Sequence, residues 1–203
     1  MEFVKDYPAE VYLLLLAHLL KYMPSLDGKR VLEVGPGAGM FMPALSALGA
    51  EVTGFELNPD FVSFAKGKGL NMLEGNLVDP ALPNIDQPFD VVMGYLVLDL
   101  LRSSTGDDDN ATRTQQYQSL INLSRLTALG GLCIQQVRPQ TGFRFTEQDW
   151  QHAGFEVLEQ VGDPMPYLVV LKKVGDPAPL EAFIPSHRIP AGRVKKRTEG
   201  YIQ

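Results

Sequence analysis

The stretch Val31-Leu32-Glu33-Val34-Gly35-Pro36-Gly37-Ala38-Gly39 decides the fold. An apolar run leads directly into three glycines at every second position, a pattern that predicts a buried strand ending in a tight turn. Glycine lacks a Cβ and reaches positive φ at little cost, so the backbone of such a turn can lie against a ligand. Residues 40–48 then carry apolar side chains at roughly helical spacing. The predicted unit is strand, glycine loop and helix, the place where α/β sheets bind nucleotide-like ligands.

The composition is that of one ordinary globular domain. The chain has 203 residues, of which 45% are hydrophobic and 21% charged, and this is ample material for a single core. The formal net charge of −6 argues against a general electrostatic grip on phosphate backbones, because that grip needs clustered lysine and arginine. Nucleic acid is therefore not expected as a partner.

The first residues and the single cysteine bear on the compartment. The N-terminus lacks the basic region of a signal peptide, and the apolar run at 13–20 is too short to cross a bilayer. Cys133 has no second cysteine to pair with and lies in an apolar run, so we expect it to be buried. The expectation is a cytoplasmic protein without membrane association.

Helical and strand patterns alternate along the chain. Strands are predicted at 30–34, 51–55, 70–73, 89–94 and 132–137, and helices at 8–23, 40–48, 59–66, 112–129 and 146–153. Residues 75–87 contain prolines without a clean period and are predicted as a loop. Two final strands, 155–161 and 167–173, are separated by only five residues. A parallel crossover needs more chain than that, so these strands are expected to form an antiparallel hairpin.

The glycine spacing separates two classes of nucleotide-like ligand. The dinucleotide fingerprint G-x-G-x-x-G needs its third glycine at position 40, where this chain has Met40. The stretch instead reads E-x-G-x-G-x-G, with Glu33 before Gly35, Gly37 and Gly39. A nicotinamide-dependent oxidoreductase is accordingly disfavoured.

Other motifs follow the glycine loop in a characteristic order. Glu56 ends the second strand, Gly75-Asn76 follows the third, Phe89-Asp90 opens the fourth, and the hairpin closes the sheet. Together with the glycine loop, they make residues 26–174 resemble the class I S-adenosylmethionine-dependent methyltransferases. The resemblance implies an α/β fold, a Rossmann-like three-layer sandwich with a mostly parallel seven-stranded sheet and a C-terminal antiparallel hairpin. It also implies S-adenosyl-L-methionine as the cofactor.

This resemblance assigns cofactor-binding roles to residues at the first two strand ends. Gly35, Gly37 and Gly39 would lie against the methionine part of the cofactor, with the Glu33 carboxylate near its ammonium group. Glu56 would accept hydrogen bonds from both ribose hydroxyls, as an acid at this place does in dinucleotide folds.

The adenine would be bound by residues after the second and third strands. Asn76 stands where the family commonly has an acid that accepts the adenine amino group, and its side-chain carbonyl can still accept that hydrogen bond. Asp79 is a rival for this role. Leu57 and Leu77 would sandwich the adenine, although an apolar residue at either place is equally well explained as core.

In the family, residues after the fourth strand face the reactive methyl group. They correspond to residues 94–97 and Asp99. Tyr95 could close over the cofactor, and Asp99 could orient or deprotonate an acceptor or be a helix-surface acid. The N-P-P-Y type of sequence, with which amino-methylating nucleic-acid enzymes grip a planar amine, does not occur here. The three histidines are scattered without metal-ligand spacing, so no metal site is expected.

The function implied by the resemblance is methyl transfer from S-adenosylmethionine to an O or N atom of a small molecule. Flanking segments would shape the acceptor site: residues 1–25, as a helix packing on or lidding the cofactor site, and the Pro/Gly-rich residues 175–203. The latter hold five basic and three acidic residues; with Arg138 or Arg144 they could receive a small acidic acceptor, or they could be a solvated tail. Two alternatives stay open, namely a catalytically weak methyltransferase-like binding or regulatory partner, and methylation of protein or RNA through the basic tail.

Overall fold

A seven-stranded sheet is the centre of the protein, which we describe from a computed structural model covering residues 9–83, 85–100, 110–139, 145–163 and 167–183, with the backbone alone at 9–11, 99–100 and 110–112. The strand order is β3-β2-β1-β4-β5-β7-β6. The strands are β1 (Arg30–Val34), β2 (Glu51–Glu56), β3 (Met72–Glu74), β4 (Phe89–Tyr95), β5 (Thr127–Gln136), β6 (Phe155–Val161) and β7 (Leu168–Lys173). β1 to β5 pair in parallel, whereas β7 runs antiparallel to both β5 and β6. The predicted sheet and its C-terminal hairpin are confirmed.

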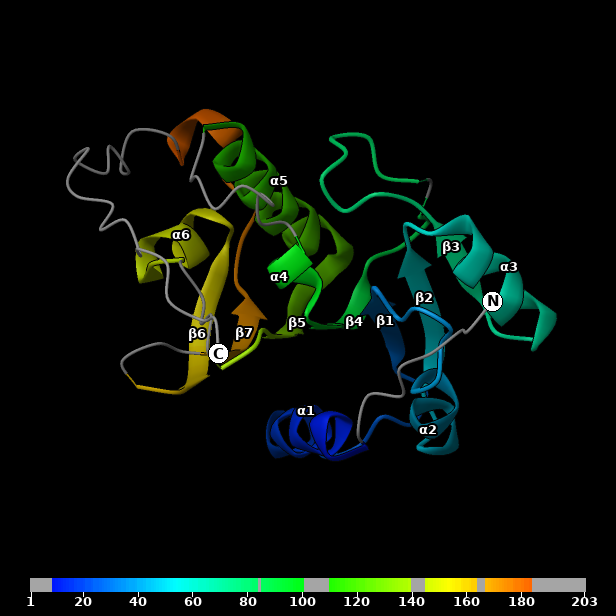
Figure 1. Cartoon of the computed structure of the whole chain (residues 1–203). Coiled ribbons are helices and arrows are strands. Elements are labelled where there is room, and N and C mark those ends of the chain that lie inside the picture. The colour runs from blue at the N-terminus through cyan, green and yellow to red at the C-terminus, as the bar shows by residue number, and fades with distance from the viewer. Residues whose placement is uncertain (1–8, 84, 101–109, 140–144, 164–166, 184–203) are drawn as a thin grey trace, which may run out of the picture.

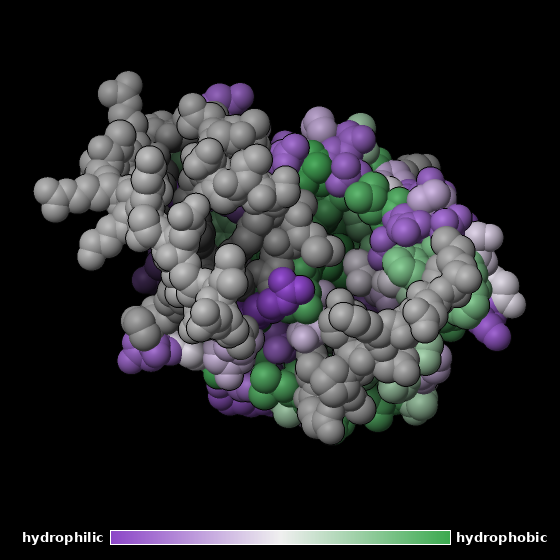
Figure 2. All heavy atoms as spheres, viewed as in Figure 1, coloured by the Kyte–Doolittle hydropathy of each residue, from purple (hydrophilic) through white to green (hydrophobic). Residues whose placement is uncertain are grey.

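Helices cover both faces of the sheet, which makes the three layers that the sequence predicts. One face carries α1 (Ala9–Tyr22), α2 (Met42–Ala47) and α3 (Pro59–Gly67). The other carries α4 (Val97–Leu100), α5 (Asn110–Leu126) and α6 (Glu147–His152). In Figure 1, α5 and α6 lie above the sheet and α1 and α2 below it. Figure 2 shows the same view by hydropathy, with apolar residues above and to the right of the middle and along the lower edge, and polar residues between and around them.

Alternation along the central strands produces two cores. In β1, Val31 packs into the core on the α1 face and Leu32 into the core on the α5 face, and both side chains are fully buried. Strands buried on both faces read as continuous apolar runs, which is why β1 and β4 were predictable. The strand order reverses between β1 and β4, so the crevice at their carboxyl ends is where an α/β sheet binds its ligand.

The boundary between α5 and β5 differs from the prediction. A helix was expected to continue to residue 129 and to end at two glycines, but α5 ends at Leu126 and the strand begins at Thr127. The Thr127 hydroxyl donates to the carbonyl of Leu123 (2.7 Å) and closes the last helical turn. The register then shifts between Phe89 and Val91 of β4, so the residues around Gly130 (φ 79°) form a bulge rather than a helix end.

Two further element boundaries also differ from the prediction. α2 is shorter than the predicted 40–48, because Phe41 precedes the first turn and Met40 stays outside the helix with an exposed side chain. β3 begins at Met72 rather than at residue 70. Cys133 is fully buried, as predicted, and burial raises the pKa of its thiol to about 12.

The segment from residue 175 onward is not a solvated tail over its described part. Residues 180–182 form a short 3-10 helix, and the next side chain, Phe183, is fully buried. Its ring lies 5.0 Å from that of Tyr117 on α5 and 5.5 Å from that of His152 on α6. The expectation of a solvated tail is therefore wrong for residues 175–183; the rest of this segment lies outside the described residues.

Candidate functional site

The glycine loop after β1 forms the floor of the site. Gly35, Gly37 and Gly39 have φ values of 67°, 56° and 74°, which confirms the tight turn that the sequence predicts. A Cβ on Gly35 would overlap Val97 of α4, and a Cβ on Gly39 would come within 2.6 Å of Leu70. Nothing described lies within 4 Å of a Cβ at Gly37. The outer two glycines are thus required by packing, whereas the middle one leaves open space against its backbone.

Glu56, at the end of β2, is bonded to this loop. Its Oε2 accepts the backbone N–H of Gly37 at 3.0 Å, and its Oε1 accepts that of Asn58 at 2.9 Å. Asn58 in turn caps α3 by accepting the N–H of Asp60. The carboxylate predicted from its place in the sequence is therefore held in position beside the open face at Gly37, and each oxygen keeps a lone pair for a further donor.

Glu33 is the second acid of the site, and its environment is different. It lies in β1, opposite Gly54 of β2 and Met93 of β4, and only 4% of it is exposed. Among the described residues no group hydrogen-bonds its Oε2. Burial raises the pKa of this carboxyl to about 8. A buried carboxyl without a donor is costly, and a cationic group placed beside it would favour its ionised form.

The candidate adenine residues lie in two different surroundings. Leu57 is 61% exposed beside Glu56, whereas Leu77 is 5% exposed and belongs to the core on the α5 face. The Asn76 side chain accepts the N–H of Val78 at 3.2 Å, and the exposed Asp79 accepts that of Ala81 at 3.0 Å. Of the two leucines that could flank an adenine, Leu77 is explained by core packing, and Leu57 remains available.

The end of β4 carries an unusual backbone. Leu96 has φ 61°, which lies in the left-handed region that residues other than glycine rarely adopt. Its N–H donates to the carbonyl of Gln136 at the end of β5 (2.8 Å). Strain of this kind persists only where the surroundings hold it, and it gathers at functional sites. Asp99 follows within α4, but its side chain lies outside the described part of the chain.

The ring of Tyr12 lies between Phe41 and Tyr95 on the α1 face. The ring of Tyr12 on α1 stacks on Phe41, next to α2, with centroids 4.4 Å apart and an interplanar angle of 18°. The same ring lies 5.9 Å from that of Tyr95. Tyr95 therefore sits at the strand end predicted for it, covered from below by α1.

Gln136 is a residue of this site that the sequence analysis missed. It pairs with Tyr95 in the sheet register, so both side chains lie on the same face at the carboxyl end of their strands. Only 6% of Gln136 is exposed, and among the described groups none hydrogen-bonds its Oε1. Its signal in the sequence was a pair of glutamines directly after the apolar run 132–134.

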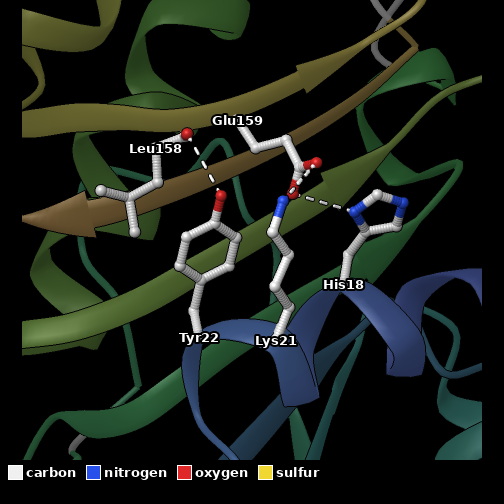
Figure 3. Close-up of polar contacts among 5 residues, drawn as sticks. All are labelled: His18, Lys21, Tyr22, Leu158 and Glu159. Atoms are coloured by element: carbon white, nitrogen blue, oxygen red, sulfur yellow. Dashed lines mark hydrogen bonds and ion pairs between the residues drawn. The ribbon is translucent and has the colours of Figure 1, made fainter.

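The C-terminal half of α1 is anchored to β6, as Figure 3 shows. The Glu159 carboxylate accepts a hydrogen bond from Lys21 Nζ (2.9 Å) and lies 3.0 Å from His18 Nδ1. The Tyr22 hydroxyl donates to the carbonyl of Leu158 (3.3 Å). The hydrogen bonds from Lys21 and His18 hold the pKa of Glu159 below its ordinary value. His18, one of the three scattered histidines, is thus engaged with β6.

The described residues also bear on metal binding and on membrane insertion. They contain no group of three or more His, Cys, Asp or Glu side chains that could hold a metal ion. None of the helices within that part of the chain has the length and apolarity to cross a membrane.

Two curated relatives match about a third of this chain. It is 37% identical over 75 residues to a ubiquinone biosynthesis O-methyltransferase of Xylella fastidiosa (34% of this chain, 30% of the relative). It is also 37% identical over 70 residues to an rRNA N(6)-adenosine-methyltransferase of Drosophila melanogaster (34% and 29%). The matches thus span about three tenths of the length of these curated relatives.

Solved structures share the fold over most of the chain. The N-methyltransferase NodS of Bradyrhizobium japonicum, crystallised with S-adenosyl-L-homocysteine, superposes with a TM-score of 0.61 at 18% identity, over 83% of this chain and 89% of that one. A family model described as a methyltransferase domain matches residues 32–134, half of the chain. The chain therefore belongs to the methyltransferase domain family, within the class I S-adenosylmethionine-dependent methyltransferases.

Proposed function

We propose that this protein transfers the methyl group of S-adenosylmethionine to an O or N atom of a small molecule. The observation that carries the proposal is the open face at Gly37, bordered by Glu56, whose Oε2 accepts the Gly37 N–H. The buried Glu33 lies in β1, two residues before the same loop. These groups fit a ligand that combines a nucleoside with an ammonium group.

The fit to the cofactor can be judged from the donor set. The orphaned oxygen of Glu33 needs a cation or a donor, and the cofactor's ammonium group supplies both. Glu56 is fixed by two amides and offers its remaining lone pairs to the two ribose hydroxyls. Asn76 would accept from the adenine amino group, and the exposed Leu57 would cover one adenine face.

When bound, the cofactor supplies an activated methyl group on its sulfonium. The protein then has to hold an acceptor in line with that methyl and to keep water away. The turn with positive φ at Leu96 joins β4 to α4, between Tyr95 and Asp99. Tyr95 would shield the reaction centre, and Asp99 would orient the acceptor or take its proton where the acceptor is protonated.

Gln136 supports an acceptor that carries an N–H or O–H group. Its buried Oε1 accepts no hydrogen bond from the described residues, so an acceptor donating to it would remove the cost of that unsatisfied oxygen. An acidic acceptor, received by the basic residues beyond 183 with Arg138 or Arg144, stays part of the proposal. Arg138 is exposed, and the other groups lie outside the described residues.

The comparisons favour no single acceptor class, but the sequence favours a small one. The relatives include an O-methyltransferase of ubiquinone biosynthesis and an rRNA methyltransferase. The net charge of −6 and the absence of an N-P-P-Y type sequence after β4 both speak against RNA.

A methyl-transfer assay tests the proposal. The purified protein, given S-adenosylmethionine labelled in its methyl group, is incubated with phenols and catechols, amino sugars, small amino and carboxylic acids, and total RNA in parallel. We expect label in one or more small-molecule pools and none in RNA. Label in RNA alone would contradict the small-molecule proposal. Tight binding of S-adenosylhomocysteine without transfer to any pool would support the binding or regulatory alternative.

A further inference from the structure

Asn122 of α5 reaches out of its helix to bond the loop that follows β3. It is fully buried, and its Nδ2 donates to two backbone carbonyls, those of Leu77 (2.8 Å) and Asp79 (2.7 Å). Its Oδ1 accepts from Gln118 Nε2, one turn earlier on the helix (3.1 Å). Both amide hydrogens are therefore used on peptides that lie more than 40 residues away in the sequence.

The loop has little structure of its own to hold it. Residues 75–83 and 85–88, its described part, contain no helix or strand. Its local bonds are turns, in which Val78 and Asp79 donate to the Asn76 side chain and carbonyl. Such turns fix the shape of a few residues, whereas the place of the loop relative to the sheet depends on the buried Leu77 side chain and on the hydrogen bonds from Asn122. Its upstream end is fixed by the Gly75 N–H, which donates to the Glu56 carbonyl (3.0 Å).

The two carbonyls that Asn122 binds flank the peptide units around Val78. Asn76 accepts the Val78 N–H, so fixing these peptides also fixes the direction in which the Asn76 side chain points. Only a side chain with two N–H donors and no charge suits this place. A carboxylate there would face two carbonyl oxygens and repel them. An apolar side chain would leave the buried carbonyl of Leu77 unsatisfied and remove the bond to the part-buried carbonyl of Asp79.

We propose that Asn122 is a positioning residue for the adenine end of the cofactor site, acting through the loop at 76–79. The inference rests on the proposed function, because it takes this loop as the adenine side of the site. It assigns part of the cofactor affinity to a helix that has no cofactor-binding motif. Preorganisation of the loop by Asn122 would lower the ordering cost that binding otherwise has to meet.

The test compares Asn122→Asp, which keeps the side-chain size, with Thr127→Val as the matched control. Thr127 is also buried, directly after α5, and among the described residues its hydroxyl bonds to the carbonyl of Leu123 in the last helical turn. Calorimetry with S-adenosylhomocysteine should show at least a tenfold loss of affinity for Asn122→Asp and less than a twofold change for Thr127→Val. The loss should be equal for 5′-methylthioadenosine, which keeps the adenine and ribose but lacks the amino-acid group.

Hydrogen exchange supplies a readout without ligand. The amides of Val78 and Asp79 should exchange faster in Asn122→Asp, and those of β1 and β4 should not. If that variant does not fold, Asn122→Ser, with one hydroxyl donor, should show a smaller loss in the same direction. Unchanged affinity and exchange in a folded Asn122 variant would overturn the inference. A wild-type protein that fails to bind S-adenosylhomocysteine would instead overturn the proposed function.

Discussion

The two proposed halves of the site, one for the cofactor and one for the acceptor, are built in different ways. The cofactor half, formed by the ends of β1, β2 and β3 with their loops, consists of backbone and of acids bonded to backbone, as at Gly37 and Glu56. The acceptor half, formed by the ends of β4 and β5 with α4 and the Tyr12 turn of α1, consists of side chains from distant segments, such as Tyr12 and Gln136. Groups that bind a fixed cofactor recur at fixed spacing, whereas acceptor groups follow no spacing rule.

The largest effect should follow from an added methyl group in the glycine loop. Gly35→Ala places a Cβ on Val97 at positive φ, so we expect a loss of about 2–5 kcal/mol in the free energy of unfolding. A Cβ on Gly37 meets no described atom within 4 Å, so Gly37→Ala should lose only about 1–2 kcal/mol in the free energy of unfolding, because of its positive φ. Urea unfolding of both variants measures the difference.

The same two glycine variants distinguish an effect on core packing from an effect on cofactor binding. Because a Cβ on Gly37 enters the open face, Gly37→Ala should lose at least about tenfold in affinity for S-adenosylhomocysteine while staying folded. Equal stability losses for the two variants, or unchanged binding by Gly37→Ala, would show that the middle glycine does not face a ligand.

Replacing Glu33 should change how stability and binding depend on pH. Burial raises the pKa of its carboxyl from the ordinary 4.5 to about 8 in the folded protein. The folded state then holds a proton that the unfolded state releases, so this group's contribution to stability falls as the pH rises from 4.5 to 8. Glu33→Gln should remove that decline and be more stable than the wild type at pH 8, as thermal unfolding can measure.

Cofactor binding gives the matching signature for Glu33. An ammonium group beside the carboxyl favours its ionised form, so at pH 7 the wild type should release up to about one proton on binding S-adenosylhomocysteine. Calorimetry in buffers of different ionisation enthalpy detects this proton, and Glu33→Gln should not release it. Proton release that is the same in the two proteins would rule out contact between Glu33 and the ammonium group.

The smallest effect on cofactor affinity is expected in the acceptor half. Gln136→Leu removes a buried oxygen that no described group bonds, so the free energy of unfolding should rise by about 1 kcal/mol. Affinity for S-adenosylhomocysteine should change by less than about twofold, and turnover of the acceptor found by the methyl-transfer assay should fall. A cofactor affinity that drops as far as in the glycine variants would erase the distinction between the halves.

The sequence predicted the elements whose causes are local. Apolar runs and glycines located β1 and the loop after it, and the short gap before residue 167 required the antiparallel hairpin. The start of β5 was missed because a pair of glycines that usually stops a helix here belongs to a bulge set by pairing with β4. Phe183 was missed because its partners, on α5 and α6, are distant in the sequence.

The residues of the candidate site likewise divide into those with a local cause, which the sequence predicts, and those without one. Glu56 was predictable because its place at a strand end determines its neighbourhood, and the structure places it on Gly37. Gln136 and Asn122 were not predictable, because each owes its role to a partner that only folding brings near. Strand register places Gln136 beside Tyr95. The packing of α5 places Asn122 against the loop at 77–79. No local pattern reports such contacts.

One titration tests the central claim that the glycine loop and Glu56 bind the cofactor. Calorimetry with S-adenosylhomocysteine is carried out on the wild type and on Glu56→Ala at the same pH and temperature. We predict one site on the wild type, and an affinity lower by about 1–3 kcal/mol, or roughly 5- to 150-fold, in the variant, because hydrogen bonds to a charged group are lost. Equal affinity in the two folded proteins, or no binding to the wild type, would contradict the account.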